Sequence, residues 1–243
     1  MQASDPGRLP ELSVHAVAFD MDGVLVDTNG AIERAWRSAA SMYGVHVSDA
    51  DLRTHVHGQP ATSTLRALFP GHTPMQRQEV WRHAARIEEQ MPYQPMPGVL
   101  PLLRALADSG IAVTLVTSNL PGRVAAILDL IGAADAFHTV VSRDDTVNGK
   151  PHPEPYLTAA SRLGVPPQRM LVFEDSDSGI RAASAAGCAC VAVRQPSKDP
   201  NVVAVVPDFT GIAVTRDDSG TPILTGVPGT PVIRLIVRRS RTD

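Results

Sequence analysis

The stretch Val17-Ala18-Phe19-Asp20-Met21-Asp22-Gly23-Val24-Leu25-Val26-Asp27 carries the strongest structural signal in this chain. It continues an apolar run that starts at Val14 and delivers two carboxylates one residue apart, Asp20 and Asp22. Such a run predicts a buried strand of a parallel sheet over residues 14–19, with Gly23 marking a tight turn. Two acids at a strand end repel each other unless a cation lies between them, which favours a metal-assisted site. A solvated turn is the alternative, because Asp-x-Asp-Gly is a common loop sequence.

Composition limits the class of protein. The chain has 243 residues, 43% hydrophobic and 19% charged, which is enough for one domain with an insertion. Its formal net charge of -3 gives no electrostatic reason to expect nucleic acid or an anionic membrane as a partner. No apolar run reaches the length of a transmembrane helix, and residues 1–10 lack a signal-peptide core. With Cys188 and Cys190 expected as buried thiols, these features indicate a cytoplasmic protein of unassigned oligomeric state.

Residues 30–91 are predicted to be a purely helical insertion. Apolar residues repeat there at helical spacing, and Trp36 and Trp81 are expected in the core of the insertion. Ser48 is a candidate cap for a further short helix. The three longer helices are expected over residues 30–43, 60–69 and 73–91.

Two linkers are expected to join the insertion to the rest of the chain. The first contains Gly30, a candidate hinge, and the second, residues 92–98, is stiffened by three prolines. We therefore expect a helical cap domain, residues 28–97 with its linkers. Residues 14–27 and 98–243 are expected to form the core domain.

Helical and strand patterns alternate from Gly98 onward. This alternation predicts an α/β fold, a doubly wound parallel sheet with helices on both faces. After Pro207 the signal weakens to a candidate hairpin and one last short strand. The strands are expected over residues 111–116, 137–142, 170–173, 188–193, 212–215, 223–225 and 232–237, and the helices over residues 99–109, 121–131, 153–163 and 178–186.

Polar side chains follow four of the predicted sheet strands. They can converge although they are distant in sequence, because parallel strands end at one edge of the sheet. Carboxylates suit a hard cation such as Mg²⁺, while hydroxyls and a lysine suit a phosphate group. Together they favour phosphoryl transfer, in which positioning and charge neutralisation do most of the catalysis. The residues are Asp20 and Asp22, Thr117 and Ser118, Lys150, and Glu174 and Asp175.

Four ordered motifs in these places resemble those of the haloacid dehalogenase superfamily. They are Asp20-Met21-Asp22-Gly23-Val24, Val116-Thr117-Ser118-Asn119, Gly149-Lys150-Pro151-His152-Pro153-Glu154-Pro155-Tyr156 and Phe173-Glu174-Asp175-Ser176. The helical insertion is similar to the cap of that superfamily. Within it, His57-Gly58 and the third motif resemble the small sugar- and polyol-phosphate phosphatases.

The resemblance implies a role for each residue. Asp20 attacks phosphorus and forms an aspartyl-phosphate, and Asp22 protonates the leaving alkoxide and then activates water. Mg²⁺ binds Asp20, the backbone carbonyl of Asp22 and Asp175, with Glu174 nearby. The phosphoryl group is held by Thr117, Ser118 and Lys150, while Asn119 and His57 are candidates for a neighbouring or substrate contact.

The implied activity is Mg-dependent hydrolysis of a small sugar or polyol phosphate. Asp22 argues against dehalogenation, because the true dehalogenases of the superfamily lack this second aspartate. A phosphomutase similar to β-phosphoglucomutase is the closest alternative. That subgroup has a histidine and an arginine in its cap where this chain aligns Ile32 and Ala61, which favours hydrolysis. A non-catalytic binding module is disfavoured because the acids and the lysine of the motifs are all present. They are Asp20, Asp22, Lys150 and Asp175.

Overall fold

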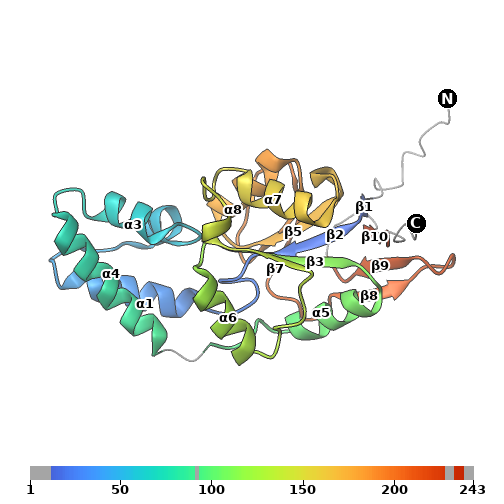
Figure 1. Ribbon diagram of the computed structural model, residues 1–243, viewed down its shortest axis with the longest axis horizontal. Helices are drawn as coiled ribbons and strands as arrows, with labels where there is room; N and C mark the ends of the chain where they lie inside the picture. Colours follow the sequence, from blue (N-terminus) through green and yellow to red (C-terminus); the bar gives the residue numbers. More distant parts are fainter. Residues whose placement is uncertain (1–11, 91–92, 228–232, 238–243) are drawn as a thin grey trace.

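The computed structural model describes residues 12–90, 93–227 and 233–237. A helical unit occupies one end of the elongated molecule and a sheet covered by helices forms the larger part (Figure 1). Some predictions fall on residues outside these ranges: all of residues 1–10, the start of the second linker at residue 92, and the start of the last predicted strand at residue 232.

A six-stranded parallel sheet forms the centre of the larger part, as the sequence predicts. The strand order is β4-β3-β2-β5-β6-β7, and every neighbouring pair is parallel. The strands are β2 (Ala16–Phe19), β3 (Ala112–Val116), β4 (Thr139–Val141), β5 (Met170–Glu174), β6 (Ala189–Val193) and β7 (Val202–Val206). Residues 202–206 form a strand that was not predicted, and this Val-rich run lies at the edge of the sheet.

Helices cover both faces of this sheet. Apolar residues of α5 (Val99–Asp108) and α6 (Pro121–Leu130) share one buried cluster with Phe19 of β2. Those of α7 (Glu154–Leu163) and α8 (Asp177–Ala186) share a second with the opposite face. The alternation along β2 explains this division, because successive side chains of a strand point to opposite faces.

A second, four-stranded sheet packs against the first cluster. Its order is β1-β10-β9-β8, and the antiparallel β8–β9 pair confirms the predicted hairpin. The prediction of one strand over residues 14–19 is wrong, because the chain changes sheets at His15. A bend there lets Val14 pair with β10 while Ala16 enters the main sheet. The strands are β1 (Leu12–Val14), β8 (Ala213–Arg216), β9 (Pro222–Thr225) and β10 (Ile233–Leu235).

The helical insertion, residues 29–89, packs around an apolar cluster of its own. Trp36 lies in this cluster, but Trp81 is 39% exposed, so its predicted core position is wrong. Ser48 caps a short helix as expected, accepting a hydrogen bond from the backbone N–H of Asp51. The elements are α1 (Asn29–Ser41), α2 (Asp49–Asp51), a π-helical turn η1 (Leu52–Val56), α3 (Ala61–Leu68) and α4 (Pro74–Glu89).

The two connections to the insertion run side by side. The backbone N–H of Asp27 donates to the carbonyl of Gln94, and that of Met96 to the carbonyl of Leu25. Gly30 lies inside the first turn of α1, so its predicted place in a linker is wrong. None of the helices in the described ranges combines the length and hydrophobicity needed to span a bilayer.

Three phenylalanines form the centre of the main core. Phe19 and Phe173 stack at 5.0 Å between ring centroids, and Phe209 lies against both at 5.9 and 5.2 Å. Each ring is essentially inaccessible to solvent. Phe19 and Phe173 directly precede the acids Asp20 and Glu174, so packing of this cluster holds the backbone that carries both acids.

Truncating the third ring is therefore expected to destabilise the whole larger part. Phe209→Ala should lower the free energy of unfolding by about 3–5 kcal/mol, the usual cost of a buried Phe→Ala change. Urea denaturation followed by far-UV circular dichroism measures it. A loss below about 1 kcal/mol would mean that the cluster does not hold the sheet.

Candidate active site

The predicted polar residues meet at the carboxyl edge of the main sheet. Asp20 follows β2, Thr117 follows β3 and Glu174 ends β5, and these three strands are adjacent. Lys150 arrives from the loop after β4. All four are buried, so the edge holds a polar cluster shielded from bulk water.

Lys150 is the ionic centre of this cluster. Its ammonium donates to Asp20 Oδ1 and to Glu174 Oε1, each at 2.5 Å, and to the carbonyl of Val116 at 3.1 Å. Burial by itself lowers the pKa of Lys150, but the charges of Asp20 and Glu174 outweigh it and raise that pKa above its usual value. Lys150 therefore remains a cation at every physiological pH.

Glu174 is fully buried and completely surrounded by donors. Oε1 also accepts from the Tyr156 hydroxyl at 2.9 Å. Oε2 accepts from the backbone N–H of Asp175 at 2.9 Å, and from the N–H and hydroxyl of Ser176 at 3.1 and 3.0 Å. Such saturation fixes the position of the Glu174 carboxylate, which in turn orients Lys150.

The other two acids are less well compensated. Burial raises the pKa of Asp20 to about 7, against the opposing charge of Lys150. Burial, followed by the charge of Glu174, also raises the pKa of Asp175 well above its usual value. Both carboxylates are thus poised to accept a cation.

Oxygen atoms of Asp20, Glu174 and Asp175 lie within 4.8 Å of one another. Asp175 is further held by the Asn29 side-chain amide at 2.8 Å, and it fills the space beside Gly23. A Cβ atom on Gly23 would lie 2.0 Å from Asp175 Oδ2, and φ there is +74°. Only glycine therefore permits this approach, which closes the carboxylate cluster. All-oxygen donors of this kind fit a divalent cation such as Mg²⁺.

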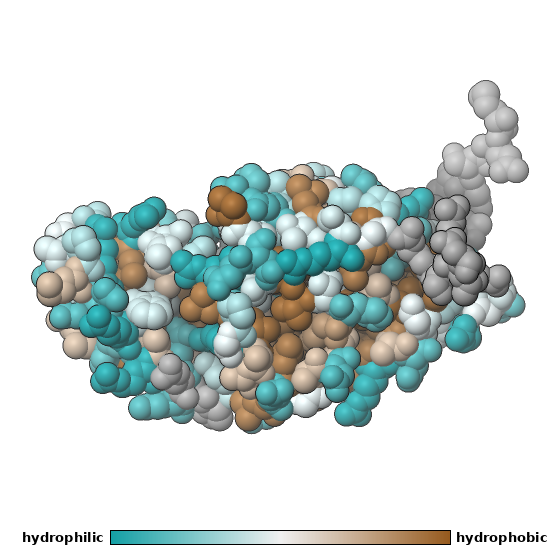
Figure 2. Space-filling view, viewed as in Figure 1, coloured by the Kyte–Doolittle hydropathy of each residue, from teal (hydrophilic) through white to brown (hydrophobic). Residues whose placement is uncertain are grey.

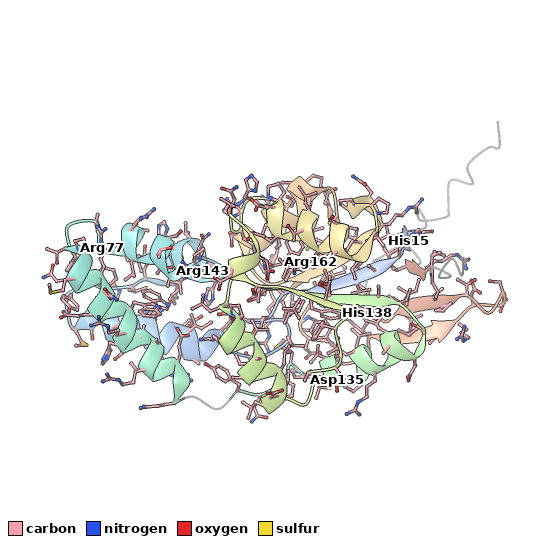
Figure 3. The ribbon with its side chains drawn as sticks, in the orientation of Figure 1. His15, Arg77, Asp135, His138, Arg143 and Arg162 are labelled. Carbon is pink, nitrogen blue, oxygen red and sulfur yellow. The ribbon has the colours of Figure 1, made fainter. Side chains whose placement is uncertain are left out.

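A cavity of about 630 Å³ opens from this edge toward the helical insertion. The core contributes Asp20, Asp22, Thr117 and Ser118, among others. The insertion contributes the apolar residues Ile32 and Ala61. Further lining residues are Trp36, Gln59, Trp81, Glu88, Tyr93, Asn119, Arg123 and Arg143. Figure 3 places Arg143 at the side of the larger part that faces the insertion.

Asp22 is held by two donors from the segment after β3. Asn119 Nδ2 donates to Asp22 Oδ2 at 2.5 Å and to the Thr117 hydroxyl at 2.9 Å. Arg123 of α6 donates from Nη2 to Asp22 Oδ1 at 3.3 Å. The predicted neighbour Asn119 therefore contacts Asp22 directly.

Arg123 is one of several cavity residues that were not predicted from the sequence. Its Nη1 donates to Glu88 of the insertion at 2.5 Å, and its guanidinium lies 5.5 Å from the Tyr93 ring centroid. Burial lowers its pKa, but Asp22 and Glu88 outweigh that effect and raise it. The sequence signal that could have indicated it is its position in the first turn of the helix that follows the hydroxyl pair.

His57 is separated from the large cavity. It lines a smaller one of about 200 Å³, which also includes Asp175, and its Nε2 lies 3.3 Å from Glu33 Oε1. Burial lowers the pKa of His57. The structure thus groups His57 with Asp175 and not with the hydroxyl pair of Thr117 and Ser118.

The sequence of residues 14–187 matches the family of haloacid dehalogenase-like hydrolases. The chain belongs to this family. Hexitol phosphatase A of Escherichia coli is 32% identical over 85% of this chain and 96% of its own length. The phosphoglycolate phosphatase of Yersinia pseudotuberculosis is 32% identical over 74% of this chain and 80% of its own.

Solved structures agree on the fold of this hydrolase. The β-phosphoglucomutase of Clostridium difficile superposes with a TM-score of 0.70 at 22% identity, covering 81% of this chain and 92% of the other. At this identity the similarity carries the fold and not the reaction. The predicted membership, the α/β fold and the hydrolase class are confirmed, whereas the roles of individual residues remain predictions.

The glycine that begins α8 gives a direct test of the cluster. A Cβ atom on Gly179 would lie 1.7 Å from Glu174 Oε1, so Gly179→Ala must displace that carboxylate. We expect the variant to lower kcat by about 10²-fold, the order that a misplacement of about 1 Å in a site can cost. Steady-state kinetics measures kcat, and the thermal midpoint reports folding.

The matched control is Gly71→Ala, because nothing lies within 4 Å of a Cβ atom there and Gly71 does not line the cavity. Normal kcat in a folded Gly179→Ala protein would show that Glu174 has no influence on turnover.

Proposed function

We propose that this hydrolase is a Mg-dependent phosphomonoesterase that acts on a small sugar or polyol phosphate. The observation that carries this proposal is the buried contact of Lys150 with Asp20 at the floor of a large cavity. A carboxylate beside an ammonium is a nucleophile placed next to the charge that an incoming phosphoryl group requires. The resemblance to hexitol phosphatase A supports the substrate class.

Asp20 attacks phosphorus in this proposal. Lys150 fixes the carboxylate, so it reaches the transition state without reorganisation. Attack forms an aspartyl-phosphate and releases the alkoxide of the substrate, and water then cleaves the acyl phosphate. The free Asp20 carboxylate is regenerated.

Asp22 transfers the protons. It protonates the departing alkoxide and then removes a proton from the attacking water, a contribution of about 10²–10⁴-fold. Asn119 fixes its orientation through the 2.5 Å hydrogen bond. Thr117, Ser118 and Lys150 hold the oxygens of the transferring group, since hydroxyls and a point charge complement phosphate.

Asp20, Asp175 and the carbonyl of Asp22 are the proposed magnesium ligands, with Glu174 as a charged neighbour. When bound, Mg²⁺ neutralises charge on the phosphoryl oxygens and on the crowded acids. The raised pKa values of Asp20 and Asp175 support a cation here. The helical insertion is proposed as a cap, residues 28–97, that covers the cavity and limits access of water.

Hydrolysis is favoured over mutase chemistry. The apolar residues Ile32 and Ala61 face the cavity where the mutase subgroup has polar groups. A non-catalytic binding module is disfavoured by the fully assembled cluster around Lys150. The proposed partner is a small sugar or polyol phosphate and not nucleic acid or a membrane. The proposed location is the cytoplasm.

The first test removes the attacking anion. Asp20→Asn keeps the shape of the side chain, so we expect a folded protein whose phosphate release falls by about 10³-fold or more, as for loss of a catalytic nucleophile. Malachite-green assays on a panel of hexose, hexitol and aryl phosphates measure it. Near wild-type turnover in the variant would exclude Asp20 as the nucleophile.

The second test removes the metal. EDTA should abolish phosphate release, and added Mg²⁺ should restore it. Mg²⁺ should also raise the melting temperature of the free protein. At a Mg²⁺ concentration of about 100 times its dissociation constant, the folded state gains about 2.7 kcal/mol of stability. Full activity in EDTA would contradict the metal assignment, while conversion of one sugar phosphate into its isomer without free phosphate would favour the mutase.

A further inference from the structure

Glu88 and Arg123 form a charged contact between the insertion and the larger part. Glu88 ends α4 and Arg123 begins α6, and their side chains meet inside the large cavity at 2.5 Å. Both are largely shielded, with side chains 14% and 27% exposed. An ion pair removed from water in this way is stronger and more selective than one on the surface.

The contact lies next to the place where a leaving group would emerge. Arg123 also reaches Asp22, the residue proposed to protonate the departing alkoxide. A group bonded to the phosphate oxygen beside Asp22 would therefore extend toward Arg123, Glu88 and the rings of Tyr93 and Trp81. These four side chains form the leaving-group subsite.

The charged groups of this subsite carry more negative than positive charge. The one guanidinium is shared by two carboxylates, those of Glu88 and Asp22. Its Nε is buried without a hydrogen-bond partner among the described residues. The guanidinium therefore bonds to carboxylates only through Nη1 and Nη2, and the contact with Glu88 is the shorter of the two. A second anion on the substrate would meet the carboxylate of Glu88 and an Arg123 that already binds two carboxylates, whereas a hydroxyl can donate to Glu88 and accept from Arg123.

We propose that Glu88 is a specificity-determining residue: by holding Arg123 in an ion pair, it makes the cavity select phosphate esters of uncharged polyhydroxy alcohols and reject esters of hydroxy acids. This inference rests on the proposed phosphatase function. It separates two chemistries that relatives of this chain have in their names, a hexitol phosphate and phosphoglycolate.

The test compares three esters in the full-length protein with Mg²⁺. They are a hexitol phosphate, phosphoglycolate and p-nitrophenyl phosphate, whose leaving group has neither hydroxyls nor a carboxylate. The quantity measured is the ratio of kcat/KM for the hexitol ester to that for phosphoglycolate. The aryl ester corrects each variant for any effect on Asp22 itself.

Two variants should change this ratio in opposite directions. Glu88→Gln frees Arg123 for a carboxylate, so the ratio should fall by about tenfold or more, mainly through a lower KM for phosphoglycolate. Arg123→Gln leaves Glu88 uncompensated, so the ratio should rise. The charge-matched controls Asp129→Asn and Arg104→Gln, both at exposed positions, should leave it unchanged.

The outcomes separate the two claims. Failure of the wild type to hydrolyse any of the three esters overturns the proposed function. Hydrolysis of the hexitol ester with an unchanged ratio in Glu88→Gln overturns the specificity inference alone. A fall of the ratio in both variants also overturns it, because it would indicate general damage to the subsite.

Discussion

The buried ion triad of Asp20, Lys150 and Glu174 is the constraint on which this structure depends. Three charged groups at the edge of a sheet are stable only if they compensate one another, because each carries a large desolvation cost. The triad meets this condition through two 2.5 Å contacts and the ring of donors around Glu174. It brings together β2, β5 and the loop after β4 through contacts that span 130 and 24 positions in sequence. Folding of the larger part and assembly of the site are therefore one event.

The helical insertion depends on the same edge through fewer and more exposed contacts. Arg123 joins Glu88 to Asp22, and Arg194 joins Asp27 to the larger part with both partners about 40% exposed. Among the non-glycine residues described, Arg194 alone has a positive φ, which is 59°. The pair of Arg194 and Asp27 is exposed, and exposed pairs contribute little stability. Figure 2 shows this division on the surface, where the insertion is predominantly polar and apolar residues gather over the larger part.

The sequence predicted the parallel sheet and its polar edge because both rest on local patterns. An apolar run ending in acids identifies a buried strand whatever its neighbours are, as at Phe19-Asp20 and Phe173-Glu174. Three features were out of reach for the same reason. The bend at His15 depends on which strand Val14 meets, β7 depends on a free edge beside β6, and Arg123 matters only because Glu88 folds back over it. Trp81 was misplaced because helical spacing does not reveal that part of the insertion faces a cavity.

Covalent phosphorylation of Asp20 is the central claim of this account. Rapid acid quenching during turnover, followed by peptide mass mapping, measures it directly. The account predicts one phosphoryl group on the peptide that carries Asp20, formed at least as fast as the first turnover and absent from Asp20→Asn. A phosphoryl group on a different residue, or a first turnover of phosphate release with no phosphorylated enzyme at any time, would contradict it.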